Sequence, residues 1–182
     1  KNILNFADEN GVFNLIYFSS MAVYDTNKKK NISEKTRLLN NPKNDYSKSK
    51  IQSEKYIKNW VNKKKNNKAL ILRIPGIVGK DSHSNFISET IKKIRDDKKI
   101  IIFNYNEKFN NIVHVNEIVK FIIKQLAIFK KKFLILNFGS KKAIKIKEVL
   151  VLISKKFNYD IKKIENLRSN KNSFLINFKK AL

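Results

Sequence analysis

A tyrosine and a lysine stand four positions apart in this chain, as Tyr46 and Lys50. On a helix this spacing places both side chains on one face, one turn from each other. A phenol has a pKa of about 10, too high for a base near neutral pH, but an ammonium group beside it stabilises the phenolate. Such a pair can exchange a proton with a substrate hydroxyl.

A serine hydroxyl follows an apolar run upstream of this pair. Residues 15–18 are all apolar and predict a buried strand, and Ser19 and Ser20 come at its end. A hydroxyl there could orient the same substrate oxygen, or it could cap the next turn. With 6 tyrosines and 40 lysines and arginines, the chain also produces Tyr–Lys pairs by chance, so a solvated helix face is the alternative interpretation of Tyr46 and Lys50.

Strands and helices alternate along the chain, which predicts an α/β fold with a parallel sheet and covering helices. Apolar runs predict strands over 12–19, 69–74, 100–103 and 133–137, and a strand or turn over 109–114. Helical spacing of apolar residues predicts helices over 1–10, 45–63, 85–97, 116–129 and 145–157. The polar segment 25–44 is expected to form a loop over the mouth of the site, and the tail 158–182 carries no clear pattern.

The chain is strongly basic, with 40 lysines and arginines against 15 acidic residues and a formal charge of +25. Such a surface attracts phosphates, but only four of the 40 are arginine, the residue suited to bidentate phosphate and base contacts. We therefore expect an anionic small molecule as partner, with no specific nucleic acid. No cysteine and only two histidines are present, which argues against a metal centre, and no run of 18 apolar residues predicts a membrane span.

Four segments resemble a known family in its own order: KNILNFADENGVFNLIYFSSMAVYD, NDYSKSKIQSEKYI, LILRIPGIVG and NNIVHVNEIVKFI. They are similar to the extended short-chain dehydrogenase/reductases, the NAD-dependent epimerase/dehydratase group that acts largely on nucleotide sugars. The resemblance covers nearly the whole chain. It implies a partial Rossmann-like parallel sheet with covering helices, plus a smaller C-terminal substrate lobe.

The resemblance also implies a C-terminal fragment. Members of the family begin with a glycine-rich turn that binds the dinucleotide, whereas this chain has only 4 glycines and no G-x-G-x-x-G. Residues 1–75 would be the C-terminal half of a Rossmann-like NAD(P)-binding domain with the Ser/Tyr/Lys residues. Residues 76–182 would be mainly a substrate-binding lobe, interleaved with late Rossmann elements. The complete enzyme would be active and this chain alone inactive.

The resemblance assigns site residues in three groups. The catalytic residues would be Ser20, Tyr46 and Lys50. Contacts to NAD or NADP would come from Phe18, Ser19, Tyr46, Lys50 and Pro75. Contacts to the substrate would come from Ser20, Gly76, Asn85, Phe86 and Asn110. Asn85 and Phe86 could equally be a helix cap and a core aromatic, and His114 is expected to be structural.

Three positions depart from the family pattern. Gly76 replaces an Asn, and Asn110 replaces an Arg that would hold the substrate diphosphate. Met21 and Ala22 replace the Asp-Glu pair of the dehydratases, and neither can transfer a proton.

The resemblance thus implies a cytoplasmic NAD(P)-dependent epimerase or oxidoreductase in surface-polysaccharide biosynthesis. Its substrate would be a sugar, in nucleotide-linked form. The resemblance also implies a homodimer. The alternative is an inactive relative or fragment that serves as a binding module.

Overall fold

The computed structural model describes residues 2–24, 31–128, 130–167 and 174–181. Its centre is a parallel sheet of three strands in the order β1-β3-β8. The strands are β1 (Asn14–Ser20), β3 (Lys68–Ile74) and β8 (Phe133–Asn137). In the register of the sheet Ser20 lies beside Ile74 and Arg73 beside Asn137, so the carboxyl ends of all three strands meet at one edge. The expected α/β fold with parallel strands is confirmed.

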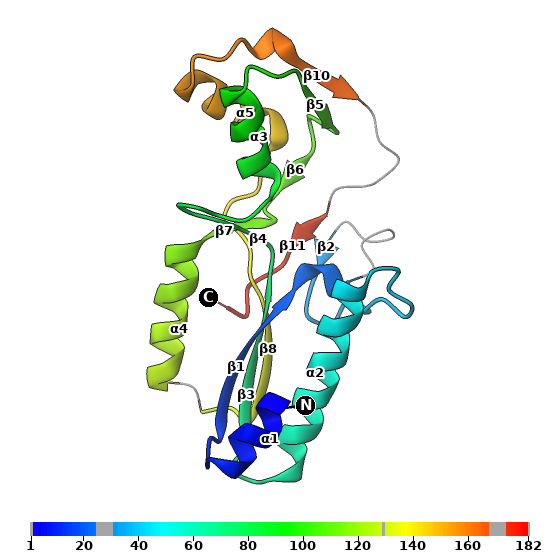
Figure 1. Cartoon of the computed structure of the whole chain (residues 1–182), viewed down its shortest axis with the longest axis vertical. Coiled ribbons are helices and arrows are strands. Elements are labelled where there is room, and N and C mark those ends of the chain that lie inside the picture. Colours follow the sequence, from blue (N-terminus) through cyan, green and yellow to red (C-terminus); the bar gives the residue numbers. More distant parts are fainter. Residues whose placement is uncertain (1, 25–30, 129, 168–173, 182) are drawn as a thin grey trace.

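Helices cover both faces of this sheet (Figure 1). One face carries α1 (Asn2–Glu9) and α2 (Asp45–Lys63), and the other carries α4 (Val115–Ile128). Side chains of β3 alternate between the two cores: Ala69 and Ile71 pack with α1 and α2, whereas Leu70 and Leu72 pack with α4. Burial on both faces explains why β3 is a continuous apolar run.

Local sequence sets the bounds of α2. The side chain of Asn44 accepts a hydrogen bond from the backbone N–H of Ser47 at 2.8 Å and caps the helix. Farther along, Trp60 and Val61 are buried against the sheet, and the Trp60 indole donates to Asp8 of α1 at 3.0 Å. The helix is thus anchored at both ends, with Tyr46 and Lys50 in its first two turns.

A smaller lobe stands beyond the carboxyl edge of the sheet, at the top of Figure 1. It packs around Ile94, Ile100 and Leu150. Its elements are α3 (Phe86–Arg95), β5 (Ile100–Phe103), α5 (Ile146–Lys156), a 3-10 turn η2 (Ile161–Lys163) and β10 (Ile164–Leu167), which pairs with β5. Short ladders link it to the sheet: β4 (Gly76–Val78) with β7 (Ile112–His114), and β6 (Lys108–Phe109) with β9 (Ile144–Lys145).

Two segments differ from the sequence-based expectation. The predicted loop 25–44 contains a short strand, β2 (Asn31–Ile32), which pairs with β11 (Leu175–Ile176). Residues 25–30 of that loop lie outside the described residues. Residues 76–78, where no strand was predicted, form β4. Among the described residues, no helix is long and apolar enough to cross a membrane.

Candidate active site

Lys50 lies between the end of β1 and the ring of Tyr46. Its Nζ donates to the backbone carbonyl of Phe18 at 2.8 Å and lies 5.6 Å from the centre of the Tyr46 ring. It also lies 5.1 Å from the centre of the Tyr17 ring. The phenol of Tyr46 is 56% exposed, so a ligand can reach it from solvent. The spacing of four residues therefore places the ammonium beside the phenol, as the sequence predicts.

Ser20 begins the 3-10 turn η1 (Met21–Val23) that follows β1. Its Oγ accepts a hydrogen bond from the N–H of Ala22 at 3.1 Å, which caps this turn. The turn is held to α2 because the Ser47 hydroxyl donates to the Ala22 carbonyl at 2.9 Å. An accepting hydroxyl keeps its own proton to donate, so the cap leaves Ser20 able to bind a substrate oxygen. Ser20 and Tyr46 therefore sit on two elements in direct contact.

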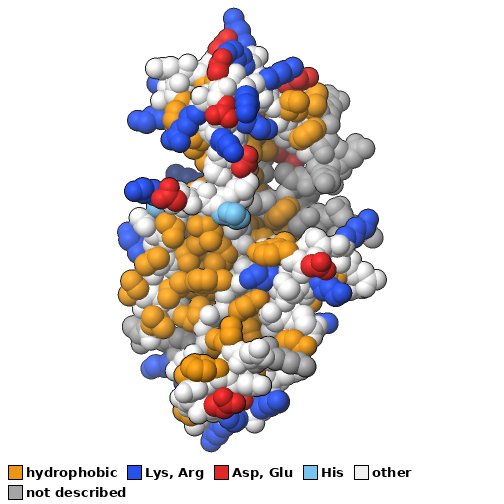
Figure 2. Space-filling model, in the orientation of Figure 1, with side chains coloured by type: hydrophobic (Ala, Val, Ile, Leu, Met, Phe, Trp, Pro, Cys, Tyr) orange, Lys and Arg blue, Asp and Glu red, His pale blue; other side chains and the backbone are white. Residues whose placement is uncertain are grey.

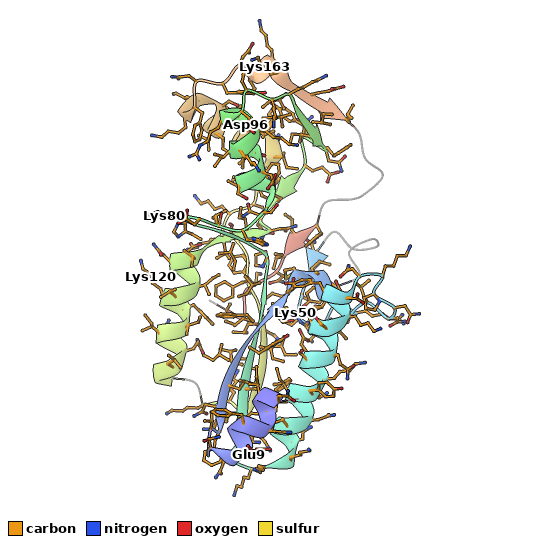
Figure 3. The ribbon with its side chains drawn as sticks, viewed as in Figure 1. Glu9, Lys50, Lys80, Asp96, Lys120 and Lys163 are labelled. Atoms are coloured by element: carbon orange, nitrogen blue, oxygen red, sulfur yellow. The ribbon has the colours of Figure 1, made fainter. Side chains whose placement is uncertain are left out.

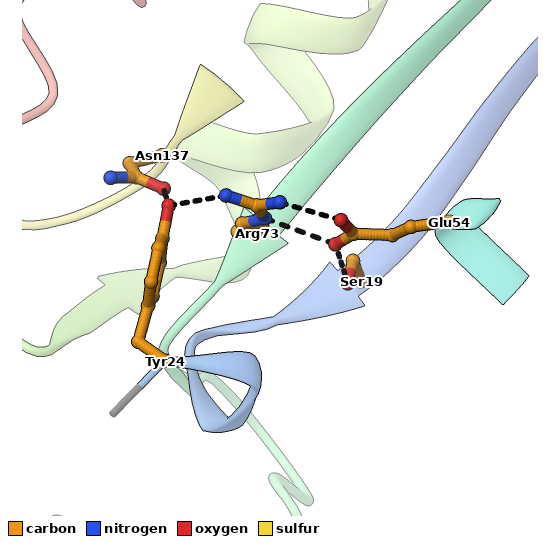
Figure 4. A network of polar contacts seen from close by, with 5 residues as sticks. All are labelled: Ser19, Tyr24, Glu54, Arg73 and Asn137. Carbon is orange, nitrogen blue, oxygen red and sulfur yellow. Dashed lines mark hydrogen bonds and ion pairs between the residues drawn. The ribbon is translucent and has the colours of Figure 1, made fainter. Parts of the chain in front are cut away.

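A buried ion pair between Arg73 of β3 and Glu54 of α2 lies next to the candidate site (Figure 4). The Nη2 and Nε of Arg73 donate to the two carboxylate oxygens of Glu54, at 2.6 and 3.0 Å. Only 3% of the Arg73 side chain and 6% of the Glu54 side chain are exposed. Two parallel bonds between a guanidinium and a carboxylate fix both direction and distance, so α2 is locked to β3.

The same network reaches the other elements of the site. The Ser19 hydroxyl donates to Glu54 at 2.5 Å, and Arg73 Nη1 donates to the Tyr24 hydroxyl at 2.6 Å. Tyr24, which ends η1, donates in turn to the side-chain oxygen of Asn137 on β8 at 2.7 Å. One set of buried contacts thus joins β1, η1, α2, β3 and β8. These include every element that carries Ser20, Tyr46 or Lys50.

Burial and charge act in opposite directions within this network. Burial would lower the pKa of Arg73, but the Glu54 carboxylate outweighs it and the pKa is raised. For Tyr24, burial raises the pKa above its usual 10 despite the nearby Arg73. Arg73 is therefore charged and Tyr24 is a neutral phenol at neutral pH. Of these residues, only Ser19 was predicted as part of the site. The sequence offered two signals for the others: the lone Arg73 inside the apolar run of β3, and Glu54 one turn after Lys50.

The expected substrate residues Asn85 and Phe86 have structural partners. The Asn85 side-chain oxygen accepts from the N–H groups of Ile87 and Ser88, and its amide donates to the carbonyls of Ile77 and His83. The ring of Phe86 packs edge-on against Phe109, with centroids 5.6 Å apart. The helix-cap and core interpretation therefore fits the geometry of both side chains.

Asn110 has structural partners as well. It is 5% exposed, its amide donates to the Ile176 carbonyl at 2.9 Å, and its oxygen accepts from the Ile176 N–H at 2.8 Å. The side chain thus holds β11 in place. Gly76 lies in the ladder with β7, where its N–H donates to the Asn111 carbonyl at 3.2 Å, and Pro75 joins β3 to β4.

The residues near Lys50 fit one end of a nicotinamide cofactor. An ammonium has three donors, and the bond to Phe18 uses one, so Lys50 can also hold ribose hydroxyls. The four glycines of the chain form no phosphate-binding turn. Among the described residues, Lys50 could therefore hold the ribose next to a nicotinamide.

Comparison with known proteins decides the family. The model of the NAD dependent epimerase/dehydratase family matches residues 1–137. The chain belongs to this family.

The match to each relative covers nearly all of this chain but only part of the relative's length. The chain is 26% identical over 161 residues to the N-acetyl-alpha-D-glucosaminyl-diphospho-ditrans,octacis-undecaprenol 4-epimerase of Escherichia coli O157:H7, covering 88% of this chain and 47% of that protein. Among solved structures, the UDP-Glc/GlcNAc 4-epimerase of Campylobacter jejuni is similar with a TM-score of 0.80 and 20% identity, covering 98% of this chain and 60% of that one. The UDP-glucuronic acid 4-epimerase of Bacillus cereus, solved with NAD, has a TM-score of 0.81 and 18% identity, covering 98% and 57%. The chain thus spans about half the length of the curated relative that it matches.

Proposed function

We propose that this chain carries the catalytic residues of an NAD(P)-dependent epimerase or oxidoreductase that acts on a diphosphate-linked sugar in surface-polysaccharide biosynthesis. The observation that carries the proposal is the position of Lys50, bonded to the carbonyl of Phe18 and 5.6 Å from the Tyr46 ring centre. The relatives support the substrate class, since their names include both nucleotide-linked and undecaprenol-linked sugars.

In the proposed reaction, Tyr46 removes the proton of a sugar hydroxyl. The Ser20 hydroxyl donates to the same oxygen and holds it in front of the phenol. Lys50 stabilises the phenolate that begins the step, because an ammonium nearby favours the charged form. A bound nicotinamide supplies the acceptor for the hydride of the same carbon. Tyr46 would then give the proton back to the oxygen that Ser20 holds, and a sugar that had turned its opposite face would leave as the epimer.

Met21 and Ala22 restrict the outcome. They occupy the two positions after Ser20, where neither side chain can donate or accept a proton. Elimination of water needs such groups, so a dehydratase is disfavoured. Epimerisation and simple oxidation or reduction both need only Ser20, Tyr46 and Lys50.

A second candidate is a binding module without redox activity. It is favoured by the use of Asn85 and Asn110 for structural bonds. Incubation of the gene product with NAD and either UDP-N-acetylglucosamine or its undecaprenyl-diphosphate counterpart separates the two candidates. We expect the C4 epimer of one substrate, identified by NMR. Absence of any epimer, ketone or NADH with both substrates would favour the binding module.

A further inference from the structure

A pocket lies between α2 and the segment that leads into this helix. Its volume is about 540 Å³, and residues 37–42 form one of its walls. Helix α2 forms the other wall with Lys48, Ile51 and Lys55, whose spacing of three and four residues places them on one face. In Figure 1 the segment before α2 loops out beside the upper end of the helix. We call this hollow the α2 pocket.

The α2 pocket is separate from the candidate active site. Lys48 is two positions from both Tyr46 and Lys50, and residues two apart on a helix do not face the same way. The described residues that line the pocket do not include Ser20, Tyr46 or Lys50. A ligand in this pocket would therefore leave the catalytic residues accessible.

Apolar residues form the floor of the α2 pocket. Leu38 and Leu39 pack together with the buried Ile51 on the core cluster that contains Met21 and Val23 of η1. The N–H of Leu39 donates to the Val23 carbonyl at 2.9 Å. The wall opposite α2 is thus held by a backbone bond and by core packing, so the pocket is formed before any ligand binds.

Three exposed cations line the pocket above this floor, namely Arg37, Lys48 and Lys55. Within the described part of the chain, their side chains form neither an ion pair nor a hydrogen bond. The stretch from Arg37 to Lys55 has two acidic residues, Asp45 and Glu54, and Glu54 is already bound in the buried ion pair. Positive charge gathered around a hollow attracts anions into it.

Positive charge alone does not mark a site on this protein, because lysine and arginine side chains are scattered over both lobes (Figure 2). Some of these cations have acidic partners, as Lys64 has with Asp8 and Lys99 with Glu165. The α2 pocket is different because it joins unpaired cations to a concave apolar floor. One of these cations, Arg37, is among the few arginines of a chain whose basic residues are mostly lysine.

We propose that the α2 pocket binds a phosphorylated small molecule of the size of a sugar phosphate or a nucleotide. The guanidinium of Arg37 can hold two phosphate oxygens side by side, and Lys48 and Lys55 can add point charges. The amides of Asn40 and Gln52, which also line the pocket, can pair with ligand hydroxyls. The volume lies within the range of small-molecule sites, roughly 300–1,000 Å³.

Titration of the gene product with inorganic pyrophosphate tests the proposal without any activity assay. The probe carries the phosphate chemistry and no sugar or base, and salt at about 0.15 M screens diffuse attraction between exposed charges. We expect saturable binding by calorimetry, together with shifts of the Leu39 and Gln52 amide signals in NMR spectra. Absence of saturable binding would overturn the proposal, and so would shifts spread over both lobes that spare Leu39 and Gln52.

Two matched double variants locate the binding site. Lys48→Gln with Lys55→Gln removes two charges from the pocket, whereas Lys58→Gln with Lys92→Gln removes two exposed lysines that do not line it. We expect the first double variant to raise the Kd for pyrophosphate at least tenfold, and the second to leave it within about twofold. Equal changes in Kd would show nonspecific attraction and would overturn the proposal.

Vesicles of phosphatidylglycerol distinguish a free phosphorylated molecule from a membrane surface, which also presents phosphates. We expect the Lys48→Gln/Lys55→Gln variant to sediment with these vesicles to the same extent as wild type, while its binding of pyrophosphate is weakened. Vesicle binding that depends on Lys48 and Lys55, with no response to pyrophosphate, would assign these cations to a membrane surface and overturn the small-molecule site.

Discussion

The guanidinium of Arg73 and the carboxylate of Glu54 meet through two bonds, of 2.6 and 3.0 Å, in the interior of the protein. Glu54 stands one turn after Lys50 on α2, and Arg73 stands one residue before the end of β3. This ion pair therefore sets the rotation of α2 against the sheet. In Figure 3 the labelled Lys50 lies between α2 and the strands of the sheet.

Glu54→Gln should lower the free energy of unfolding by about 3–5 kcal/mol, because it leaves a buried guanidinium without its counter-charge. Denaturation in urea measures the change. Glu165→Gln is the matched control, since Glu165 pairs with Lys99 at the surface with 40% and 67% of the side chains exposed, and it should cost less than about 1 kcal/mol. Equal losses in the two variants would show that the buried pair does not anchor α2.

Tyr24→Phe removes the hydroxyl that accepts from Arg73 and donates to Asn137. Two buried groups then lose a partner, so we expect a loss of about 1–3 kcal/mol at pH 7. Urea denaturation again gives the value, with Tyr105→Phe in the smaller lobe as the control. A loss no larger than that of the control would exclude a structural role for the Tyr24 hydroxyl.

The same residue predicts a dependence on alkaline pH. Burial raises the pKa of Tyr24 above its usual 10, so the folded state keeps its proton where the unfolded state has lost it. The resulting stabilisation is complete below pH 10 and is lost as the pH rises through the raised pKa. Wild type should therefore lose more stability above pH 10 than Tyr24→Phe, which lacks the ionisable group. Parallel pH profiles for the two proteins would contradict the shift.

Asn110→Ala separates a structural role from a substrate contact. The variant loses both bonds to the backbone of Ile176, so we expect a loss of about 1–3 kcal/mol and faster exchange of the Ile176 amide. Ser140→Ala, which removes a bond to the carbonyl of Ile112, is a control that should leave the Ile176 amide unchanged. Unaltered exchange at Ile176 in Asn110→Ala would restore Asn110 as a candidate for substrate binding.

The sequence predicted the long elements because their signals are local. Helix α2 follows from the helical spacing of its apolar residues, which include Ile57, Trp60 and Val61. The short strands β2 and β4 were missed because two or three residues carry no periodicity, and only their distant partners β11 and β7 make them strands.

The candidate site was predicted in part for a similar reason. Tyr46 and Lys50 are one helix turn apart, so their spacing alone places them together. Arg73 and Glu54 come into contact only when β3 packs against α2, so no local spacing in the sequence predicts that they are bonded. Asn85 and Asn110 were assigned by resemblance, while local hydrogen bonding gives them other partners.

The most direct test of the catalytic assignment is the kcat of Tyr46→Phe in the gene product, measured with saturating NAD and the substrate that it epimerises. Phenylalanine keeps the ring beside Lys50 and removes only the hydroxyl that would transfer the proton. We expect kcat to fall by about 10²-fold or more while Tyr105→Phe retains wild-type turnover. A Tyr46→Phe enzyme with kcat within about twofold of wild type would contradict the role of Tyr46 as acid and base.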